Sequence, residues 1–316
     1  MRLPRSTTAA CAALLTAAAM GTGCGSQDGV VGSVRVGGSS TLLPTVQQAA
    51  AGFTARHPLA RVDVDLTGTG DGFSLLCDGI ADAAAASRPQ TPRERRACAA
   101  SGVATVPLLV GRDAVVVFTA RGSRVPACVS TRELRLLAGE PAAGRRTWAG
   151  VGPAGLPLLL VVPEAGSGTR DAFVQGVLTS TGGDRAAALR PDAVSVPQGP
   201  QMLARVLGAR GAIGVTGFAT VQPWLDRVRP LAINDGGGCV TPSRDSISSG
   251  AYPLTRDLWM FMRGNAQGSD ADAIAAFGDV VASSALLGRP DSGLSQEDIA
   301  TTQRAWDERA SGGAGQ

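Results

Sequence analysis

The chain contains no lysine and only one histidine, His57, and these absences exclude several chemistries. A phosphate loop of the GxxxxGK[ST] type and a lysine Schiff base both require lysine. A zinc site with several histidine ligands requires more than His57. A Ser-His-Asp triad would depend on that one histidine, which precedes Pro58 in a chain without a GxSxG motif. We therefore predict no catalytic residues, no metal site and no cofactor.

Charged and aromatic residues are also scarce. The 316 residues are 44% hydrophobic, 17% charged and 4% aromatic, and all 29 basic residues are arginine, against 26 acidic residues. This composition is typical of a chain that buries a real core in one large or two medium domains. A formal net charge of +3 gives no case for a nucleic-acid partner. We predict a globular protein that acts as a monomer.

Long apolar runs are absent except near the start. Arg2 and Arg5 precede Ala9–Met20, a run of 12 residues that is too short to span a bilayer and typical of a signal-peptide core. Cys24 follows among small residues, as in a bacterial lipoprotein signal, although Gly21 stands where such signals usually carry leucine. We predict a signal peptide over 1–23, a lipid on Cys24 and a tether over 24–32; ordinary secretory cleavage is the alternative. The mature protein is then extracytoplasmic and anchored to the outer face of the cell membrane.

Four cysteines follow Cys24, and an even number outside the cytoplasm predicts two disulfides. Three pairings are possible for Cys77, Cys98, Cys128 and Cys239. We favour Cys77–Cys98, which closes a short local loop, and Cys128–Cys239 by elimination. Free buried thiols are the alternative, and the lack of a CxxC motif argues against a metal.

Strand-like and helical segments alternate along the rest of the chain, which predicts an α/β fold. Strands are expected at 34–36, 61–66, 82–86, 114–118, 156–162, 212–215 and 254–262. Helices are expected at 42–56, 201–207, 270–284 and 295–309, together with a short helix that follows Gly72 and ends at Leu76 and one that follows Thr169 and ends at about Leu178.

Small hydroxyl residues and glycines recur where a strand ends and a helix begins. They form Ser39-Ser40-Thr41, the GTGDG run that contains Thr69, and Ser167-Gly168-Thr169; Ser87 and Arg88 follow another extended stretch. Helix N-termini, close backbone approach and hydroxyl donors suit a tetrahedral oxyanion, and arginine matches phosphate geometry. Each cluster alone is more often a plain helix cap, but several in one exported chain favour an anion site.

The order of these motifs resembles the phosphate-binding lipoproteins that serve high-affinity phosphate ABC transporters, over about Val34 to Met262. The resemblance rests on GSSTLLP, GTGDGFSLLCDGIADAAAASRP, GRDAVVVF, EAGSGTRDAF, GAIGVTGFA, GGCVTPSRDSI and YPLTRDLWMFM. It implies a two-lobed, periplasmic-binding-protein-like fold of type II with two crossing hinge strands, at Asp113–Phe118 and Tyr252–Met262. Lobe I would comprise 33–112 and 251–310, and lobe II 113–250.

The resemblance also implies a ligand and its contacts. Inorganic phosphate would bind between the lobes and be delivered to the permease subunits of an ABC importer. The implied phosphate-binding residues are Ser40, Thr41, Leu42 (through its backbone amide), Thr69, Ser87, Arg88, Ser167, Gly168 and Thr169.

Two positions depart from the family pattern. Pro163 stands where many relatives carry an arginine, so Arg88 must supply the positive charge, with Arg170 as an additional candidate. Some relatives also hold a carboxylate that accepts the proton of hydrogen phosphate, and here Ser87 or Arg88 takes that place. Asp71 is the nearest candidate acceptor, although an aspartate in a glycine-rich turn equally often bonds its own backbone.

Three alternative functions are kept open. The chain could bind another oxyanion, such as sulfate, molybdate or a phosphonate. It could be a receptor-like sensory lipoprotein without a transport role, or a phosphatase or esterase. The enzyme alternative lacks a histidine cluster, metal-ligand spacing and a nucleophile elbow, so we predict that the protein is not an enzyme.

Overall fold

The computed structural model describes residues 29–165, 167–179, 188–197 and 199–309. The predicted signal peptide, Cys24 and the first part of the predicted tether lie outside these residues. The end of that tether belongs to the fold, because β1 begins at Gly32 and the Val30 amide donates a hydrogen bond of 3.3 Å to Nδ1 of His57. Among the described residues, no helix is long and apolar enough to cross a membrane.

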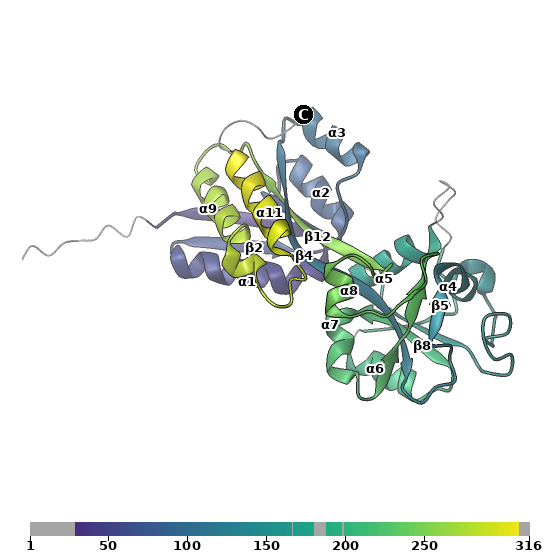
Figure 1. The fold of residues 1–316 in the computed structure, drawn as a ribbon. Coiled ribbons are helices and arrows are strands. Elements are labelled where there is room, and N and C mark those ends of the chain that lie inside the picture. Colours follow the sequence, from purple (N-terminus) through teal and green to yellow (C-terminus); the bar gives the residue numbers. More distant parts are fainter. Residues whose placement is uncertain (1–28, 166, 180–187, 198, 310–316) are drawn as a thin grey trace, which may run out of the picture.

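Two lobes share one continuous sheet, as Figure 1 shows. The strand order is β2-β1-β3-β12-β4-β8-β6-β7, and β9 pairs with the end of β4. Its strands are β1 (Gly32–Gly38), β2 (Ala60–Asp65), β3 (Ala83–Ala86), β4 (Thr105–Ala120), β6 (Leu159–Pro163), β7 (Val194–Val196), β8 (Ala212–Gly217), β9 (Val228–Pro230) and β12 (Thr255–Arg263). A second sheet contains β5 (Cys128–Ser130), β10 (Ala232–Asn234) and β11 (Cys239–Val240).

Helices cover both faces of the sheet in each lobe. In lobe I these are a 3-10 turn (Ser40–Leu42), α1 (Leu43–Arg56), α2 (Thr69–Cys77), α3 (Pro92–Ala100), α9 (Ala271–Val281), α10 (Ser284–Leu287) and α11 (Gln296–Glu308). In lobe II they are α4 (Thr131–Ala138), a 3-10 turn (Glu140–Ala142), α5 (Gly168–Phe173), a π-helical turn (Val174–Leu178), α6 (Pro200–Leu207), α7 (Phe218–Val221), a 3-10 turn (Gln222–Trp224) and α8 (Arg244–Ser248). The prediction of an α/β, two-lobed fold is confirmed.

The two crossing strands are β4 and β12, and β4 is much longer than the sequence predicts. The first part of β4 pairs with β12 and its second part pairs with β8, so the strand passes from one lobe into the other. Opposite charges face each other at the crossing, where Arg112 pairs in register with Asp257 and Asp113 with Arg256. Because cross-strand opposite charges stabilise a sheet, the Gly111-Arg112-Asp113 run continues the strand instead of ending it.

Each lobe has its own apolar core on either face of its part of the sheet. Val110 belongs to a core of lobe I, and Ala114 to a core of lobe II. Tyr252 and Leu254 also pack in the lobe II core, and the Tyr252 hydroxyl donates to the Val115 carbonyl at 3.2 Å. The core of lobe II therefore extends past the predicted boundary at residue 251.

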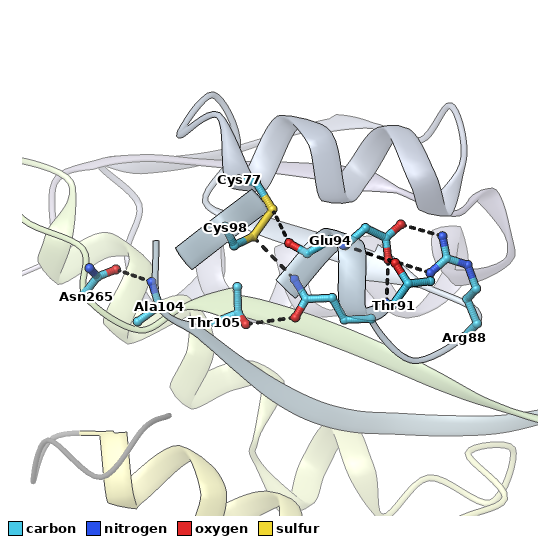
Figure 2. Close-up of a disulfide and its surroundings, with 9 residues drawn as sticks. Cys77, Arg88, Thr91, Glu94, Cys98, Ala104, Thr105 and Asn265 are labelled. Atoms are coloured by element: carbon cyan, nitrogen blue, oxygen red, sulfur yellow. Dashed lines mark hydrogen bonds and ion pairs between the residues drawn. A yellow bond between two sulfur atoms is a disulfide. The ribbon is translucent and has the colours of Figure 1, made fainter. Parts of the chain in front are cut away.

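Both predicted disulfides are confirmed. Cys77–Cys98 joins the end of α2 to α3 across 21 residues, and Figure 2 shows its surroundings. Cys128–Cys239 joins β5 to β11 across 111 residues. By limiting the unfolded chain, each stabilises the fold by about 2–4 kcal/mol.

Candidate functional site

A cavity of about 500 Å³ lies between the lobes. Six of the predicted phosphate-binding residues line it, namely Ser40, Thr69, Asp71, Ser87, Arg88 and Gly168. Its other lining residues are Ser39, Thr67, Gly68 and Gly70 from lobe I, and Asp171, Ala172, Val174, Gln175 and Thr179 from lobe II. Segments separated by about a hundred residues thus meet where the sequence predicts an anion site.

The lobe I wall is built where β1 and β3 end and α2 begins. The Ser39 amide donates to the Ala85 carbonyl at 2.7 Å, and the Gly68 amide donates to the Gly38 carbonyl at 2.9 Å. Glycine is required where α2 meets β1, since a Cβ on Gly72 would lie 2.5 Å from Cα of Gly38. The close approach brings Thr69 beside Ser39, and Thr69 is in turn linked to Ser87.

Hydrogen bonds join Thr69 and Ser87 within this wall. The Ser87 amide donates to Thr69 Oγ1 at 3.2 Å, and the two hydroxyl oxygens also lie 3.2 Å apart. A hydroxyl donates one hydrogen bond and accepts others. Each hydroxyl can therefore keep its neighbour and still reorient toward an oxyanion.

Ser39 is a site residue that the predicted set omits. It is 2% exposed and lines the cavity, and its hydroxyl oxygen has no hydrogen-bond partner among the described residues. A buried hydroxyl without a partner costs stability unless a ligand or water satisfies it. The sequence does contain a signal for Ser39, because it directly precedes the predicted ligands Ser40 and Thr41 in the GGSST run.

Leu42, in contrast, is not placed to contribute its amide. That N–H donates to the Ser39 carbonyl at 3.1 Å within the 3-10 turn, and the leucine side chain is buried in the lobe I core. Because the amide is already satisfied, the structure gives no role in anion binding to Leu42.

The lobe II wall begins at the Ser167-Gly168-Thr169 segment. Ser167 is the N-cap residue of α5, and Thr169 is 5% exposed. A Cβ on Gly168 would lie 2.9 Å from Ser39 Oγ and would also clash with Thr41 Oγ1. The two ligand loops, one from each lobe, are therefore in direct contact, and only glycine fits between them.

Arg256 on β12 connects these loops, and the predicted set omits it as well. Its Nη1 donates to the Gly168 carbonyl at 2.5 Å, and its Nη2 lies 3.4 Å from the hydroxyl oxygens of both Thr41 and Thr169. Asp113 on β4 holds the guanidinium through a 2.8 Å ion pair. The side chain is 8% exposed, and its buried Nε has no partner among the described residues.

Arg256 gives the site the buried charge that Pro163 does not supply. Arg256 belongs to the TRD triplet within YPLTRDLWMFM. A strand prediction for this segment does not say whether the arginine faces the cleft or the solvent. Only the pairing with β4 places this residue against the ligand loops of both lobes.

The two arginines expected to supply charge are both engaged elsewhere. Arg88 lines the cavity but makes a two-pronged ion pair with Glu94. Arg170 lies toward β6 and β7, where its Nη1 donates to the Pro163 carbonyl at 3.2 Å and lies 3.3 Å from Ser195 Oγ. Neither guanidinium is an unpaired cation in the cleft.

Two carboxylates face the cavity from opposite walls. Asp71 is in the first turn of α2, and Asp171 is in α5. Burial raises the pKa of Asp171, although Arg170 and Arg256 act in the opposite direction. Neither side chain has a hydrogen bond or ion pair with the described residues, so both are placed to accept a hydrogen bond from a ligand hydroxyl. The described residues contain no cluster of three or more His, Cys, Asp or Glu that could hold a metal.

A two-lobed fold with a hydroxyl-lined cleft between the lobes defines a class of solute-binding proteins. The family model described as a PBP superfamily domain matches residues 25–285, and the chain belongs to this family. Relatives and solved structures that resemble the chain agree with this membership.

Curated relatives and solved structures show the same likeness. The chain is 32% identical over 234 residues to protein SphX of Synechococcus elongatus, covering 72% of this chain and 67% of that protein. It is 26% identical over 262 residues to the phosphate-binding protein PstS of Staphylococcus epidermidis, covering 81% and 77%. The crystal structure of a possible phosphate-binding protein from Planctomyces limnophilus superposes with a TM-score of 0.73 at 25% identity, covering 89% of this chain and 99% of the other.

Proposed function

We propose that this protein captures inorganic phosphate in the interlobe cavity and delivers it to an ABC import permease. The observation that carries the proposal is the meeting of Ser39 and Thr41 with Gly168 and Thr169 around the buried Arg256. Similarity to a phosphate-binding protein supports phosphate as the ligand. The predicted signal over 1–23 and Cys24 support export and anchoring to the outer face of the membrane.

Hydroxyl and amide groups from both lobes would form the phosphate shell. These are Ser39, Ser40, Thr41, Thr69, Ser87, Ser167, Gly168 and Thr169. Arg256 would act mainly by holding the two loops together and by favouring negative charge above it, since charged donors make the stronger hydrogen bonds. Closure of the two lobes on the ligand would then signal occupancy to the permease.

Asp71 and Asp171 would provide selectivity against sulfate. Hydrogen phosphate can donate a hydrogen bond from its hydroxyl to a carboxylate, whereas sulfate at neutral pH has no hydroxyl to donate one. A site built to hydrogen-bond a ligand hydroxyl strongly rejects an analogue that lacks it, because its acceptor is then left unpaired. The selectivity would come from these acceptors rather than from the cavity's size.

Calorimetric titration of the purified protein, freed of bound anion, tests the proposal. We expect tight binding of phosphate and no heat with sulfate. Binding of both would assign a general oxyanion site, and binding of neither would contradict the transport function and favour a sensory lipoprotein.

A further inference from the structure

Four contacts fix the guanidinium of Arg88 in the cavity wall. Its Nη1 donates to Glu94 Oε2 at 2.8 Å and to the Pro89 carbonyl at 3.1 Å, and its Nη2 donates to Glu94 Oε1 at 2.7 Å. The guanidinium carbon also lies 5.5 Å from the centre of the Phe73 ring. Figure 2 shows the guanidinium turned toward Glu94 on α3.

Glu94 is itself fixed in place, so the ion pair is part of the built structure. It is the third residue of α3 and completes a capping box, in which its Oε2 accepts hydrogen bonds of 2.8 Å from the amide and the hydroxyl of Thr91. The Cys77–Cys98 disulfide ties α3 to α2 (Figure 2). Burial opposes the ionisation of Glu94, but hydrogen bonds from Arg88 and Thr91 outweigh it and lower the pKa of the carboxyl.

The consequence concerns the charge of the cavity wall. Its ionisable lining residues are Asp71, Arg88 and Asp171. Within the lining, Glu94 cancels the charge of Arg88. Arg256 is paired with Asp113 and, like Arg170, is not a lining residue, although both arginines act electrostatically on Asp171. The lining itself therefore presents two aspartates and no cation without a carboxylate partner, in a site whose expected ligand is an anion.

We propose that Glu94 is a specificity-determining residue that, by neutralising Arg88, restricts the cleft to a singly charged, protonated oxyanion. This inference rests on the proposed function. With two carboxylate acceptors and no unpaired cation in the lining, the favoured ligand is a monoanion with two protons to donate, such as dihydrogen phosphate. A dianion such as sulfate meets both repulsion and unpaired acceptors.

Glu94→Gln tests the inference with little change in structure. Glutamine can also complete a capping box, so α3 keeps its cap while Arg88 loses its counter-charge. The matched control is Glu133→Gln, because Glu133 completes the same kind of capping box with Ser130 on α4 and has no ion pair with an arginine in the part of the chain that the structure describes.

The readout is the affinity for phosphate at low ionic strength, measured by calorimetry, and the affinity for sulfate, measured through its competition with phosphate because direct titration of the wild type with sulfate is expected to give no heat. Since Coulomb energy scales with ligand charge, an unpaired Arg88 is expected to raise sulfate affinity about tenfold and phosphate affinity only about threefold. The gain should shrink in high salt and disappear in the Arg88→Gln/Glu94→Gln double variant. Glu133→Gln should leave both affinities unchanged.

The other possible outcomes separate a failure of the inference about Glu94 from a failure of the proposed function. If the wild type binds phosphate but Glu94→Gln behaves like Glu133→Gln, the inference is wrong and the proposed function stands. Weaker phosphate binding by Glu94→Gln would mean that Glu94 presents Arg88 to the ligand, and equal gains for both anions would mean that phosphate binds as the dianion; both overturn the inference. A wild-type protein that binds no phosphate would overturn both the proposed function and the inference about Glu94.

Discussion

The dipeptide Arg-Asp occurs once on each hinge strand, and the two copies make ion pairs on opposite faces of the crossing. Arg256–Asp113 faces the cleft and touches the ligand loops of both lobes. Arg112–Asp257 faces away from it, and Arg112 also pairs with Asp298 of α11 and donates to the Ser248 carbonyl at 2.6 Å. Because neighbouring side chains on a strand point to opposite faces, one motif serves two purposes. The cleft-facing pair organises the site, and the other pair braces the hinge.

Removing the cleft-facing cation should have the largest effect. Arg256→Met keeps much of the side-chain volume but leaves the half-buried Asp113 without its counter-charge. The free energy of unfolding should therefore fall by about 3 kcal/mol. Phosphate affinity should fall by about a hundredfold, since the loops lose charged hydrogen bonds worth about 1.5–3 kcal/mol each. Urea unfolding and calorimetry measure the two effects. An unchanged affinity in a folded variant would show that Arg256 is structural only.

Separating the loops that Arg256 joins should have the next largest effect on binding. Gly168→Ala places a methyl group against Ser39 and Thr41, and the lobes cannot close at that point without a shift. Overpacking costs about 1–3 kcal/mol, so phosphate affinity should fall about tenfold or more. Calorimetry measures the loss, and Gly155→Ala is a control because nothing lies within 4 Å of its Cβ position. Equal binding by both variants would contradict the contact between the loops.

Breaking the ion pair that faces away from the cleft should lower the stability of the fold while leaving phosphate affinity almost unchanged. Arg112→Met removes a cation that is 15% exposed and leaves Asp257 and Asp298 without it. The free energy of unfolding should fall by about 2 kcal/mol, whereas phosphate affinity should change by less than about threefold because Arg112 lies outside the cavity. The same unfolding and calorimetric measurements apply. A loss of affinity as large as that of Arg256→Met would abolish the distinction between the two faces.

The smallest expected effect is the pH dependence of the outward-facing pair. Burial opposes the ionisation of Asp298, but hydrogen bonds from Ser295 and the charge of Arg112 lower its pKa. A lowered pKa stabilises the fold above the unfolded-state pKa, and that stabilisation is lost as the pH falls through the folded-state value. Asp298→Asn should therefore be less stable than the wild type at pH 7, and the difference should narrow below about pH 4. A difference that does not vary with pH would contradict the ion pair's contribution.

Several parts of the fold were predictable because local patterns carry them. The helical spacing of Leu43, Val46 and Phe53 predicts α1, and the helix predicted from Ser295 is α11, which Ser295 caps. The helices α3 and α4 were missed, although Thr91 and Ser130 each precede a glutamate by three residues. The apolar pattern of α3 is weak, so its capping box was the more informative signal. In α4 the spacing of Leu134 and Leu137, which are both buried, was a second signal beside the capping box.

The candidate site was predictable in its loops and not in its charges. Runs of serine, threonine and glycine at strand ends identify Ser40, Thr69, Ser87 and Gly168, since those residue types allow close backbone approach and donate hydrogen bonds. Arg88 was predicted as the anion's counter-charge, but Glu94 holds it. An ion pair depends on which carboxylate lies nearest in space, and a sequence alone does not state that distance.

The sequence by itself determined the α/β class, the presence of two disulfides and the order of the ligand loops, because these follow from residue types, the cysteine count and the order of motifs. Tertiary structure decided which arginine enters the cleft and which carboxylate neutralises it. Arg256 and Asp113 are far apart in the chain, and only the register of β12 against β4 places them face to face and turns Arg112 and Asp257 the other way. A shift of one residue would exchange the two faces, since side chains alternate along a strand.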